Sequence, residues 1–450
     1  MATQTKLSGF PEWLPGDRIV EERIIDRLKH LFELHGFTPI HTRAVETLDT
    51  LAKDGEIDKE IFALHRLHES SQNSTLGLHF DLTVPLSRYI VENAGRLAFP
   101  FKSYRIQPVW RGERPQDGRF REFIQADIDV IAEDTLAEHY EIEVPLVFVE
   151  AFNELAELGV PPIRIVVNNR KIVEGFARGL GVEKVTEVLR CLDKLDKIGP
   201  EAVAEELAQH AGATTTQQRQ LLALASIESD TSSFADEVLA LGVDNPLLID
   251  GVEALTRVVD AASAIRPGSM RAQLKIARGL DYYTGTVYET QLLGHESLGS
   301  IASGGRYDTL VSNGKTRYPG VGMSLGVSRL MSRLVGKKAL VQATRPVPTA
   351  VLVAVSDEST RHVADATAQM LRSRGIPTEV APTAAKFGKQ IRFADRRSIP
   401  FVWFPESPAG HEVKDIRSGE QVLSDPEVWV PPAEDLWPEA VRIPESDGGN

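Results

Sequence analysis

The chain has 450 residues, and its 64 acidic side chains outnumber its 50 Lys and Arg side chains, so its formal charge is −14. A chain of this length predicts about two to four domains. The negative charge excludes a protein that binds nucleic acid through its net charge, so any RNA contact requires local basic patches. The single cysteine, Cys191, excludes a disulfide framework and is expected to be a small buried residue.

The N-terminal sequence lacks a positively charged stretch followed by an apolar one, so it predicts no export signal. No run approaches the roughly 18 apolar residues of a membrane span. We therefore expect a cytoplasmic protein with no membrane partner. His65 and His68 are the closest histidines, and their spacing does not favour a metal site.

The first predicted helix covers residues 18–35, where Gly36 ends an apolar stripe of Val20, Ile24, Leu28 and Leu31. A short strand follows near Ile40. Residues 79–90 predict another short strand and helix, in which Asp81 and Thr83 share one face. From its position alone, Asp81 is expected to cap the following helix.

Residues 101–130 predict two strands joined by a long charged turn. In the second strand the apolar residues alternate with a polar face of Phe123, Gln125, Asp127 and Asp129. In the first, one face carries Arg105, Gln107, Val109 and Arg111. A solvated outer face is the simpler interpretation. The choice of arginine over lysine and the aromatic ring favour an antiparallel sheet that holds a nucleotide.

Residues 136–158 predict a helix and residues 163–169 a strand, after which Glu, Ala, Leu and Lys dominate up to about residue 267. This region predicts a helical insertion between two halves of one sheet, although an independently folded partner domain would look the same. Strands are predicted again at 273–276 and 286–291. Between them Arg278, Asp281, Tyr282 and Tyr283 crowd a turn flanked by glycines, as in loops whose backbone approaches a ligand.

A glycine-rich strand enters a helix over residues 318–335, and the Pro-containing segment 337–348 predicts a linker. The strands and helices of residues 349–431 alternate, which predicts a small, mostly parallel α/β domain. Its second helix, residues 385–396, has a predicted buried stripe of Phe387, Ile391 and Ala394. Opposite lie Lys386, Lys389, Arg392 and Arg396. This basic face is either solvated or meets phosphate. The acidic tail, residues 432–450, predicts disorder.

Several of these stretches resemble known motifs. WRGERPQDGRFREFIQ resembles motif 2 of class II aminoacyl-tRNA synthetases, and residues 318–335 resemble motif 3. ARGLDYYTGTVYE and SGGRYDTL resemble the signatures of the histidyl-tRNA synthetase family, and KFGKQIRFAD resembles its anticodon-binding domain. The resemblance covers nearly the whole chain. No G-x-x-x-x-G-K-[ST] loop occurs, so a P-loop is not expected to hold ATP.

The resemblance implies an α+β fold with a class II antiparallel sheet, flanking helices, a helical insertion and a C-terminal α/β anticodon-binding domain. The implied domains are a first catalytic part at 1–169, an insertion at 170–267, and a second catalytic part at 268–336. A linker at 337–348, the anticodon-binding domain at 349–431 and the tail at 432–450 follow. The family also implies a homodimer, built through the first helix and strand.

The implied function is histidine–tRNA ligase activity in two steps. ATP and L-histidine give histidyl-adenylate and pyrophosphate, and the histidyl group then passes to the terminal ribose of tRNA(His). ATP is expected with Mg²⁺, whose ligands the sequence does not identify, and no prosthetic group is implied. The alternative is a catalytically inactive relative that regulates a histidine-biosynthesis enzyme. Such relatives lack the anticodon-binding domain and lose signature residues, which this chain keeps.

The resemblance assigns roles to individual residues. The implied catalytic residues are Arg111 and Arg278. The implied ATP-binding residues are Arg111, Glu113, Arg119, Phe123 and Arg329. The implied histidine-binding residues are Asp81, Thr83, Gln125, Asp129, Arg278, Tyr282, Tyr283 and Tyr307. The implied tRNA-binding residues are Gln116, Lys386, Lys389 and Arg392. Ser328 departs from the family pattern, which has an acidic residue just before the motif 3 arginine.

Overall fold

The computed structural model of the chain describes residues 7–52, 57–68, 74–276, 282–336 and 339–444. Its contacts divide the chain into two units. The first contains Met1–Pro11, Arg27–Ala156 and Pro161–Arg333, and the second contains Glu12–Asp26, Glu157–Val160 and Leu334–Asn450. Along the described residues, no helix is both long enough and apolar enough to cross a bilayer.

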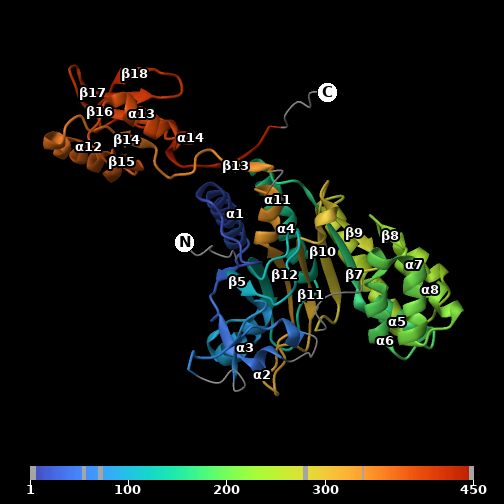
Figure 1. Cartoon of the computed structure of the whole chain (residues 1–450). Helices are drawn as coiled ribbons and strands as arrows, with labels where there is room; N and C mark the ends of the chain where they lie inside the picture. The colour runs from blue at the N-terminus through green and yellow to red at the C-terminus, as the bar shows by residue number, and fades with distance from the viewer. Residues whose placement is uncertain (1–6, 53–56, 69–73, 277–281, 337–338, 445–450) are drawn as a thin grey trace. The chain divides into compact units, whose positions relative to one another are not determined.

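The first unit is built on a nine-stranded sheet with the order β1-β5-β6-β12-β11-β10-β7-β9-β8 (Figure 1). Its strands are β1 (Thr38–Pro39), β5 (Phe101–Trp110), β6 (Glu122–Ile131), β7 (Ile163–Asn169), β8 (Glu228–Ser229), β9 (Met270–Gln273), β10 (Thr286–Leu292), β11 (Ala302–Tyr307) and β12 (Gly320–Gly326). The pairs β1–β5 and β7–β9 are parallel, and the other neighbours are antiparallel. The sheet is therefore the mainly antiparallel one that the sequence predicts.

The second and third strands of this sheet form the predicted hairpin. Strands β5 and β6 pair along their whole length, from Phe101 opposite Ile131 to Trp110 opposite Glu122. The apolar side chains of β6 are buried on one face of the sheet, and its polar side chains lie on the other, as period-two alternation requires. The helix α4 (Tyr140–Leu155) packs against β6, β7 and β12.

The segment between β7 and β9 carries the predicted helical region. It contains α5 (Arg170–Gly179), α6 (Val185–Leu192), α7 (Leu195–Glu206), the π-helix η5 (Leu207–Ala211), α8 (Thr215–Ala225), α9 (Phe234–Ala240) and α10 (Pro246–Ile265). Figure 1 shows α5 to α8 gathered beside β7, β8 and β9. The region is not purely helical, because the short strand β8 pairs with β9 at the edge of the sheet. Cys191 lies buried in α6, as predicted.

The remaining elements precede the hairpin in the chain or follow it. The first helix is α1 (Pro15–Leu34), and its predicted apolar stripe is buried. A three-stranded sheet of order β2-β4-β3 contains β2 (Val45–Thr47), β3 (Ala63–Leu64) and β4 (Leu76–Leu78). Short helices accompany it: α2 (Leu48–Leu51), η1 (Ile57–Glu60), α3 (Thr83–Asn93) and η3 (Ala94–Arg96). Further along lie η4 (Ala156–Leu158), η6 (Glu296–Leu298) and α11 (Val327–Leu334).

The second unit contains the predicted α/β domain, with a five-stranded sheet of order β15-β14-β16-β17-β18. The strands β14 (Val351–Val353), β15 (Thr378–Val380) and β16 (Phe401–Ser407) are parallel, as predicted. An antiparallel hairpin of β17 (Gly410–Asp415) and β18 (Gln421–Leu423) extends the sheet beyond that prediction. The helical elements are η7 (Glu358–Thr360), α12 (Arg361–Ser373) and α13 (Phe387–Asp395).

The predicted buried stripe of α13 is wrong at Phe387, which is 38% exposed. Its ring packs edge-on against Phe404, with the centroids 4.8 Å apart. Gln390 is buried instead, because its amide bridges the backbone of Val355: Oε1 accepts from the Val355 nitrogen at 3.0 Å, and Nε2 donates to the Val355 oxygen at 2.8 Å. A side-chain amide can therefore take a buried position on a helix when it forms hydrogen bonds to the backbone groups just after a strand.

The predicted linker and disordered tail require correction. Strand β13 (Val341–Ala343), inside the linker, pairs with β19 (Ala440–Arg442), inside the tail. The tail also contains α14 (Ala433–Leu436). Asp435 is buried and accepts two hydrogen bonds from Arg417, each 2.7 Å long. The acidic composition suggested disorder, but the charge of Asp435 is neutralised by Arg417, which lies in the turn after β17. Residues 445–450 lie outside the described residues.

Candidate active site

One cavity of about 980 Å³ opens on the polar face of the β5–β6 hairpin in the first unit. Strands β10, β11 and β12 and the helices of residues 185–210 also line it. Of the residues predicted for ATP and histidine, those that line it are Asp81, Thr83, Arg111, Glu113, Arg119, Phe123, Gln125, Tyr282, Tyr283 and Arg329. Residues from four separate stretches of sequence thus face one space.

Asp81 lines this cavity and lies directly before α3. Its Oδ1 accepts a hydrogen bond from the backbone nitrogen of Val84 at 3.1 Å, so the helix-capping interpretation describes one of its two oxygens. The other oxygen, Oδ2, is buried and has no partner among the described residues. Burial raises the pKa of Asp81 to about 6, against the opposing effects of the Val84 hydrogen bond and of Arg111.

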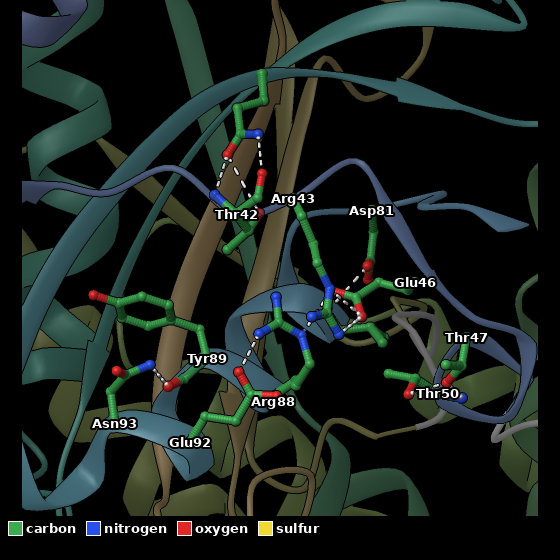
Figure 2. A network of polar contacts seen from close by, with 12 residues as sticks. Thr42, Arg43, Glu46, Thr47, Thr50, Asp81, Arg88, Tyr89, Glu92 and Asn93 are labelled. Atoms are coloured by element: carbon green, nitrogen blue, oxygen red, sulfur yellow. Dashed lines mark hydrogen bonds and ion pairs between the residues drawn. The ribbon is translucent and has the colours of Figure 1, made fainter. Parts of the chain in front are cut away.

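A buried carboxylate holds α3, and thereby Asp81, in place. Glu46 on β2 is 1% exposed and accepts hydrogen bonds from the guanidinium groups of Arg43 and Arg88, with its closest contacts both 2.8 Å (Figure 2). Arg88 lies on α3 and also donates to Glu92 at 2.6 Å. Two cations on one buried carboxylate offset its desolvation, so the strand and the helix are fixed to each other.

A buried cluster of charged side chains lies beneath the cavity and consists of Arg105, Asp127 and Asp129. Of these three residues, only Asp129 was predicted as a site residue. Arg105 on β5 is fully buried, and it stands directly opposite Asp127 on β6. Its Nη2 donates to Oδ2 of Asp129 and lies 3.9 Å from Oδ2 of Asp127. The alternation had placed these side chains on the polar faces. It could not show that they pair, since pairing depends on the register between the strands.

Asp127 faces the cavity, whereas Asp129 lies underneath it. Ser324, which stands opposite Asp127 on β12, donates a hydrogen bond to Oδ1 of Asp127. Burial raises the pKa of Asp127 to about 7, although Arg105 and Ser324 act in the other direction. Asp129 stands opposite Gly322, where a Cβ would come within 2.1 Å of its Oδ1. The missing side chain therefore leaves room for the Asp129 carboxylate.

The predicted tyrosines fall into two groups. Tyr282 and Tyr283 line the cavity, and their rings lie edge to face with centroids 4.9 Å apart. Burial raises the pKa of both phenols, so they stay protonated at neutral pH. Tyr307 is buried in the core, and its hydroxyl donates to Oδ1 of Asp129 at 2.7 Å. In this structure Asp129 and Tyr307 satisfy each other, and neither lines the cavity.

Other parts of the cavity lining are cationic. Arg111 donates from Nε to the Phe80 oxygen at 2.9 Å, and its guanidinium lies 5.1 Å from the centre of the Phe123 ring. Arg119 is exposed and donates to Glu113 at 3.2 Å. Burial, followed by the charge of Arg119, lowers the pKa of Arg329. These guanidinium groups provide fork-shaped donors of the kind that bind phosphate oxygens.

Ser328, the departure from the family pattern, has a structural partner. It is buried, and its Oγ accepts a hydrogen bond from the backbone nitrogen of Ile124 at 2.9 Å. The bond ties the first turn of α11 to the start of β6, between Phe123 and Gln125. Arg329 therefore stays next to the hairpin without an acidic neighbour.

Further cations that were not predicted for the site reach the cavity from the insertion and from the segment after β9. Arg190, Lys194, Lys197 and Lys275 all line the cavity wall. They are spread over more than 80 positions and form no basic stripe in the sequence, so only the fold brings them together. Lys194 also pairs with Glu206 at 2.7 Å.

Some predicted residues do not reach this cavity. Gln116 is exposed in the hairpin turn, where it forms a bridge with Arg119. Lys386, Lys389 and Arg392 are exposed on α13 in the second unit. Arg278 and Asp281 lie outside the described residues. Within the described ranges, no group of three His, Cys, Asp or Glu side chains forms a metal site.

The raised pKa of Asp127 predicts a pH-dependent stability. A carboxyl group with a higher pKa in the folded chain stabilises the fold at low pH, and this contribution is lost as the pH rises through the folded pKa. For Asp127 the loss falls between its ordinary value of 3.8 and about 7. Asparagine does not titrate, so Asp127→Asn should gain stability relative to the unsubstituted protein as the pH increases, by up to a few kcal/mol at about 1.4 kcal/mol for each pKa unit.

Differential scanning calorimetry of the ligand-free proteins at pH values from about 4 to 8 measures this difference in Tm. Glu133→Gln, an exposed carboxylate just beyond the same strand, is the control and should show no such trend. A Tm difference for Asp127→Asn that stays constant over this range would contradict the expected burial of charge.

The family model described as histidyl-tRNA synthetase matches residues 9–330, and that of an anticodon binding domain matches residues 349–404. The chain is 54% identical to the histidine–tRNA ligase of Cutibacterium acnes, over 97% of this chain and 99% of the relative. The crystal structure of histidyl-tRNA synthetase from Nostoc sp. PCC 7120 superposes with a TM-score of 0.82 at 33% identity, and covers 94% of this chain and 97% of that one.

A structure from Bacillus halodurans, described as an ATP phosphoribosyltransferase regulatory subunit/histidyl-tRNA synthetase, has a TM-score of 0.71 over 86% of this chain and 96% of its own. At 19% identity it supports the fold alone. The full-length identity to the ligase and the match over both parts of the chain decide the assignment. The chain belongs to the histidyl-tRNA synthetase family.

Proposed function

We propose that this chain attaches L-histidine to tRNA(His) and that the cavity on the β5–β6 hairpin is where histidine and ATP react. The observation that carries the proposal is one space whose lining contains the buried carboxylate of Asp81 and the guanidinium groups of Arg111, Arg119 and Arg329. An amino acid presents an ammonium group, and ATP presents a triphosphate. The two kinds of lining group match these opposite charges.

In the first step an oxygen of the histidine carboxylate attacks the α-phosphorus of ATP. The bond to the β-phosphate oxygen breaks, and pyrophosphate leaves with the electron pair. Two anions have to approach each other, so fixed cations at the reacting phosphate lower the barrier by electrostatic preorganisation. We assign this role to Arg111 and, by family resemblance, to Arg278. Arg119 and Arg329 would hold the outer phosphates, with Glu113 beside Arg119.

Phe123 is proposed to stack on the adenine ring. Its ring now lies 5.1 Å from the Arg111 guanidinium, which leaves Arg111 next to both the base and the α-phosphate. Mg²⁺ would enter with the triphosphate as part of the substrate. This ion keeps several waters and needs only one or two carboxylates. Glu113 and Glu289 are carboxylates that line the cavity.

Asp81, Thr83 and Gln125 would bind the α-ammonium group. Tyr282 and Tyr283 would enclose the side chain. By family resemblance Asp129 and Tyr307 are assigned to the imidazole, and to reach it they would have to exchange their present hydrogen bond to each other for bonds to the ligand. An amino acid that leaves such buried polar groups unpaired is rejected by roughly 10⁴-fold or more, which makes a separate editing site unnecessary.

In the second step a terminal ribose hydroxyl of the tRNA attacks the activated carbonyl carbon, and AMP leaves. A phosphate oxygen of the adenylate can take the hydroxyl proton. We assign tRNA contacts to Gln116 and to the basic face of α13. The protein is also proposed to act in the cytoplasm as a homodimer. The second candidate function is a regulatory role without catalysis. The pyrophosphate exchange experiment described next distinguishes it from the ligase.

Pyrophosphate exchange into ATP, measured with each of the twenty amino acids and no tRNA, tests the proposed reaction. We expect exchange with histidine alone, because only its imidazole matches the buried acceptors and phenols. Absence of exchange with every amino acid would refute the enzyme and favour the regulatory role. Exchange with another amino acid would instead refute the assignment of the pocket.

Arg111→Ala should slow adenylate formation by about 10²–10³-fold, the usual cost of removing a charge-stabilising donor. Single-turnover measurements at saturating ATP and histidine isolate the chemical step. Arg114→Ala is the matched control, since Arg114 is exposed in the same turn and does not line the cavity. A loss below about threefold for Arg111→Ala would remove Arg111 from the proposed catalytic group.

Replacing Lys386, Lys389 and Arg392 together by alanine should raise the KM for tRNA and leave pyrophosphate exchange unchanged. These side chains are exposed on one helix of the second unit, where they can contact phosphates without touching the cavity. A variant that exchanges Lys and Arg at the three positions keeps the charge and serves as the control. If tRNA binding has the same salt dependence with and without these charges, the helix has no role in tRNA binding.

A further inference from the structure

Three side chains with oxygen acceptors, Asp81, Gln125 and Asp127, line the cavity. Oδ2 of Asp81 and Oε1 of Gln125 are buried and have no hydrogen-bond partner among the described residues. Both side chains are more than nine-tenths buried, and both residues line the cavity. Asp127 is 2% exposed, and Ser324 donates its hydrogen bond to Oδ1 and not to Oδ2. The nearest described cation to Oδ2 of Asp127, Arg105, is 3.9 Å away, beyond hydrogen-bonding distance.

Among the described residues, the charges around these acceptors do not balance. Asp81, Asp127 and Asp129 provide three carboxyl groups, and Arg105 is the fully buried cation between them. Arg105 bonds to Asp129 and not to Asp127. Arg111 stands at the rim, and its Nε is already bonded to the Phe80 oxygen. Among the described residues, no compact cation with several donors therefore meets these acceptors.

An amino acid ammonium has this chemistry, because it carries one positive charge and three N–H donors. Gln125 and Asp127 are two residues apart on the same face of β6, about 7 Å along the strand. Asp81 approaches from the start of α3 and interacts electrostatically with Asp127. An ammonium group between these three side chains would give each acceptor a donor.

We propose that Asp127 is a further histidine-binding residue, which accepts a hydrogen bond from the α-ammonium group together with Asp81 and Gln125. Ser324 and Arg105 are positioning residues: the Ser324 hydroxyl holds Oδ1, and Arg105 fixes the neighbouring Asp129, so that Oδ2 of Asp127 faces the cavity. This inference rests on the proposed function, since it identifies the cavity's amino acid as the ligand.

The burial of Asp127 supports this role. Without a ligand its pKa is raised to about 7, because desolvation outweighs Arg105 and Ser324, and the charges of Asp129 and Asp81 add to the effect. A bound ammonium group would favour the ionised carboxylate and reverse much of that shift. Histidine binding would then relieve an unfavourable charge arrangement of the empty site.

Titration calorimetry with three ligands tests the proposal: L-histidine, histamine, which has the ammonium but no carboxylate, and imidazolepropionate, which has the carboxylate but no ammonium. Asp127→Asn keeps the shape and removes the charge. We expect its affinity for histidine and for histamine to fall about 10- to 100-fold, the value of a charge-assisted hydrogen bond. Its affinity for imidazolepropionate should change less than about twofold.

An equal loss for all three ligands would overturn the proposal and make Asp127 a structural residue. Unchanged affinity for all three would also overturn it. Ser324→Ala provides a second variant with the charge intact, and a selective loss for the two ammonium ligands is expected there as well. Should Asp127→Asn not fold, that variant alone decides. Glu133→Gln serves as the control and should bind like the unsubstituted protein.

Failure of the proposed function would be seen separately, in the unsubstituted protein. If that protein does not bind histidine, or exchanges pyrophosphate with a different amino acid, the function is wrong. If it binds histidine and the two variants show no ammonium-selective loss, only the role of Asp127 is wrong.

Discussion

Arg105 lies fully buried in the middle of β5, where an unpaired guanidinium would cost several kcal/mol. Its neutralisation requires a carboxylate from β6, and the register of the hairpin supplies Asp127 directly opposite and Asp129 two residues further along. A shift of one residue would turn both carboxylates to the apolar face of the sheet. The charge group therefore fixes the register, and the same register places Arg111, Phe123 and Gln125 along the cavity.

Strand β12 completes this arrangement through small residues. Opposite Asp129 it has Gly322, and opposite Asp127 it has Ser324, whose hydroxyl is long enough to reach the carboxylate. A larger side chain at Gly322 would occupy the position of the Asp129 carboxylate. At the end of the same strand Gly320 leaves room for the ring of Tyr307, which would otherwise lie 2.4 Å from a Cβ. The packing of Asp127, Asp129 and Tyr307 therefore depends on the small residues of β12 as much as on the charged residues themselves.

The alternation of the hairpin allowed its two faces to be predicted, because a period of two needs only local sequence. The partners of Arg105 and Asp127 could not be predicted in this way, since Ser324 comes from a strand almost 200 residues further on and meets β6 only through the strand order. The cationic wall of the insertion escaped prediction for the same reason. The tail misled the prediction in the opposite direction: its acidic composition suggested disorder, but β19 pairs with β13 and Arg417 neutralises Asp435.

The two groups of charges around the cavity differ in how they are used. The guanidinium groups of Arg111 and Arg119 come from the turn between β5 and β6, and that of Arg329 comes from α11; all three line the cavity, where we propose that the phosphates bind. Around the proposed amino acid site Glu46, through Arg88, fixes the helix that follows Asp81, while Arg105 neutralises only some of the buried carboxylates. A ligand that brings a cation to one group and an anion to the other satisfies both. A molecule with a single charge would leave one group unpaired, and that cost favours amino acid and nucleotide together over either one alone.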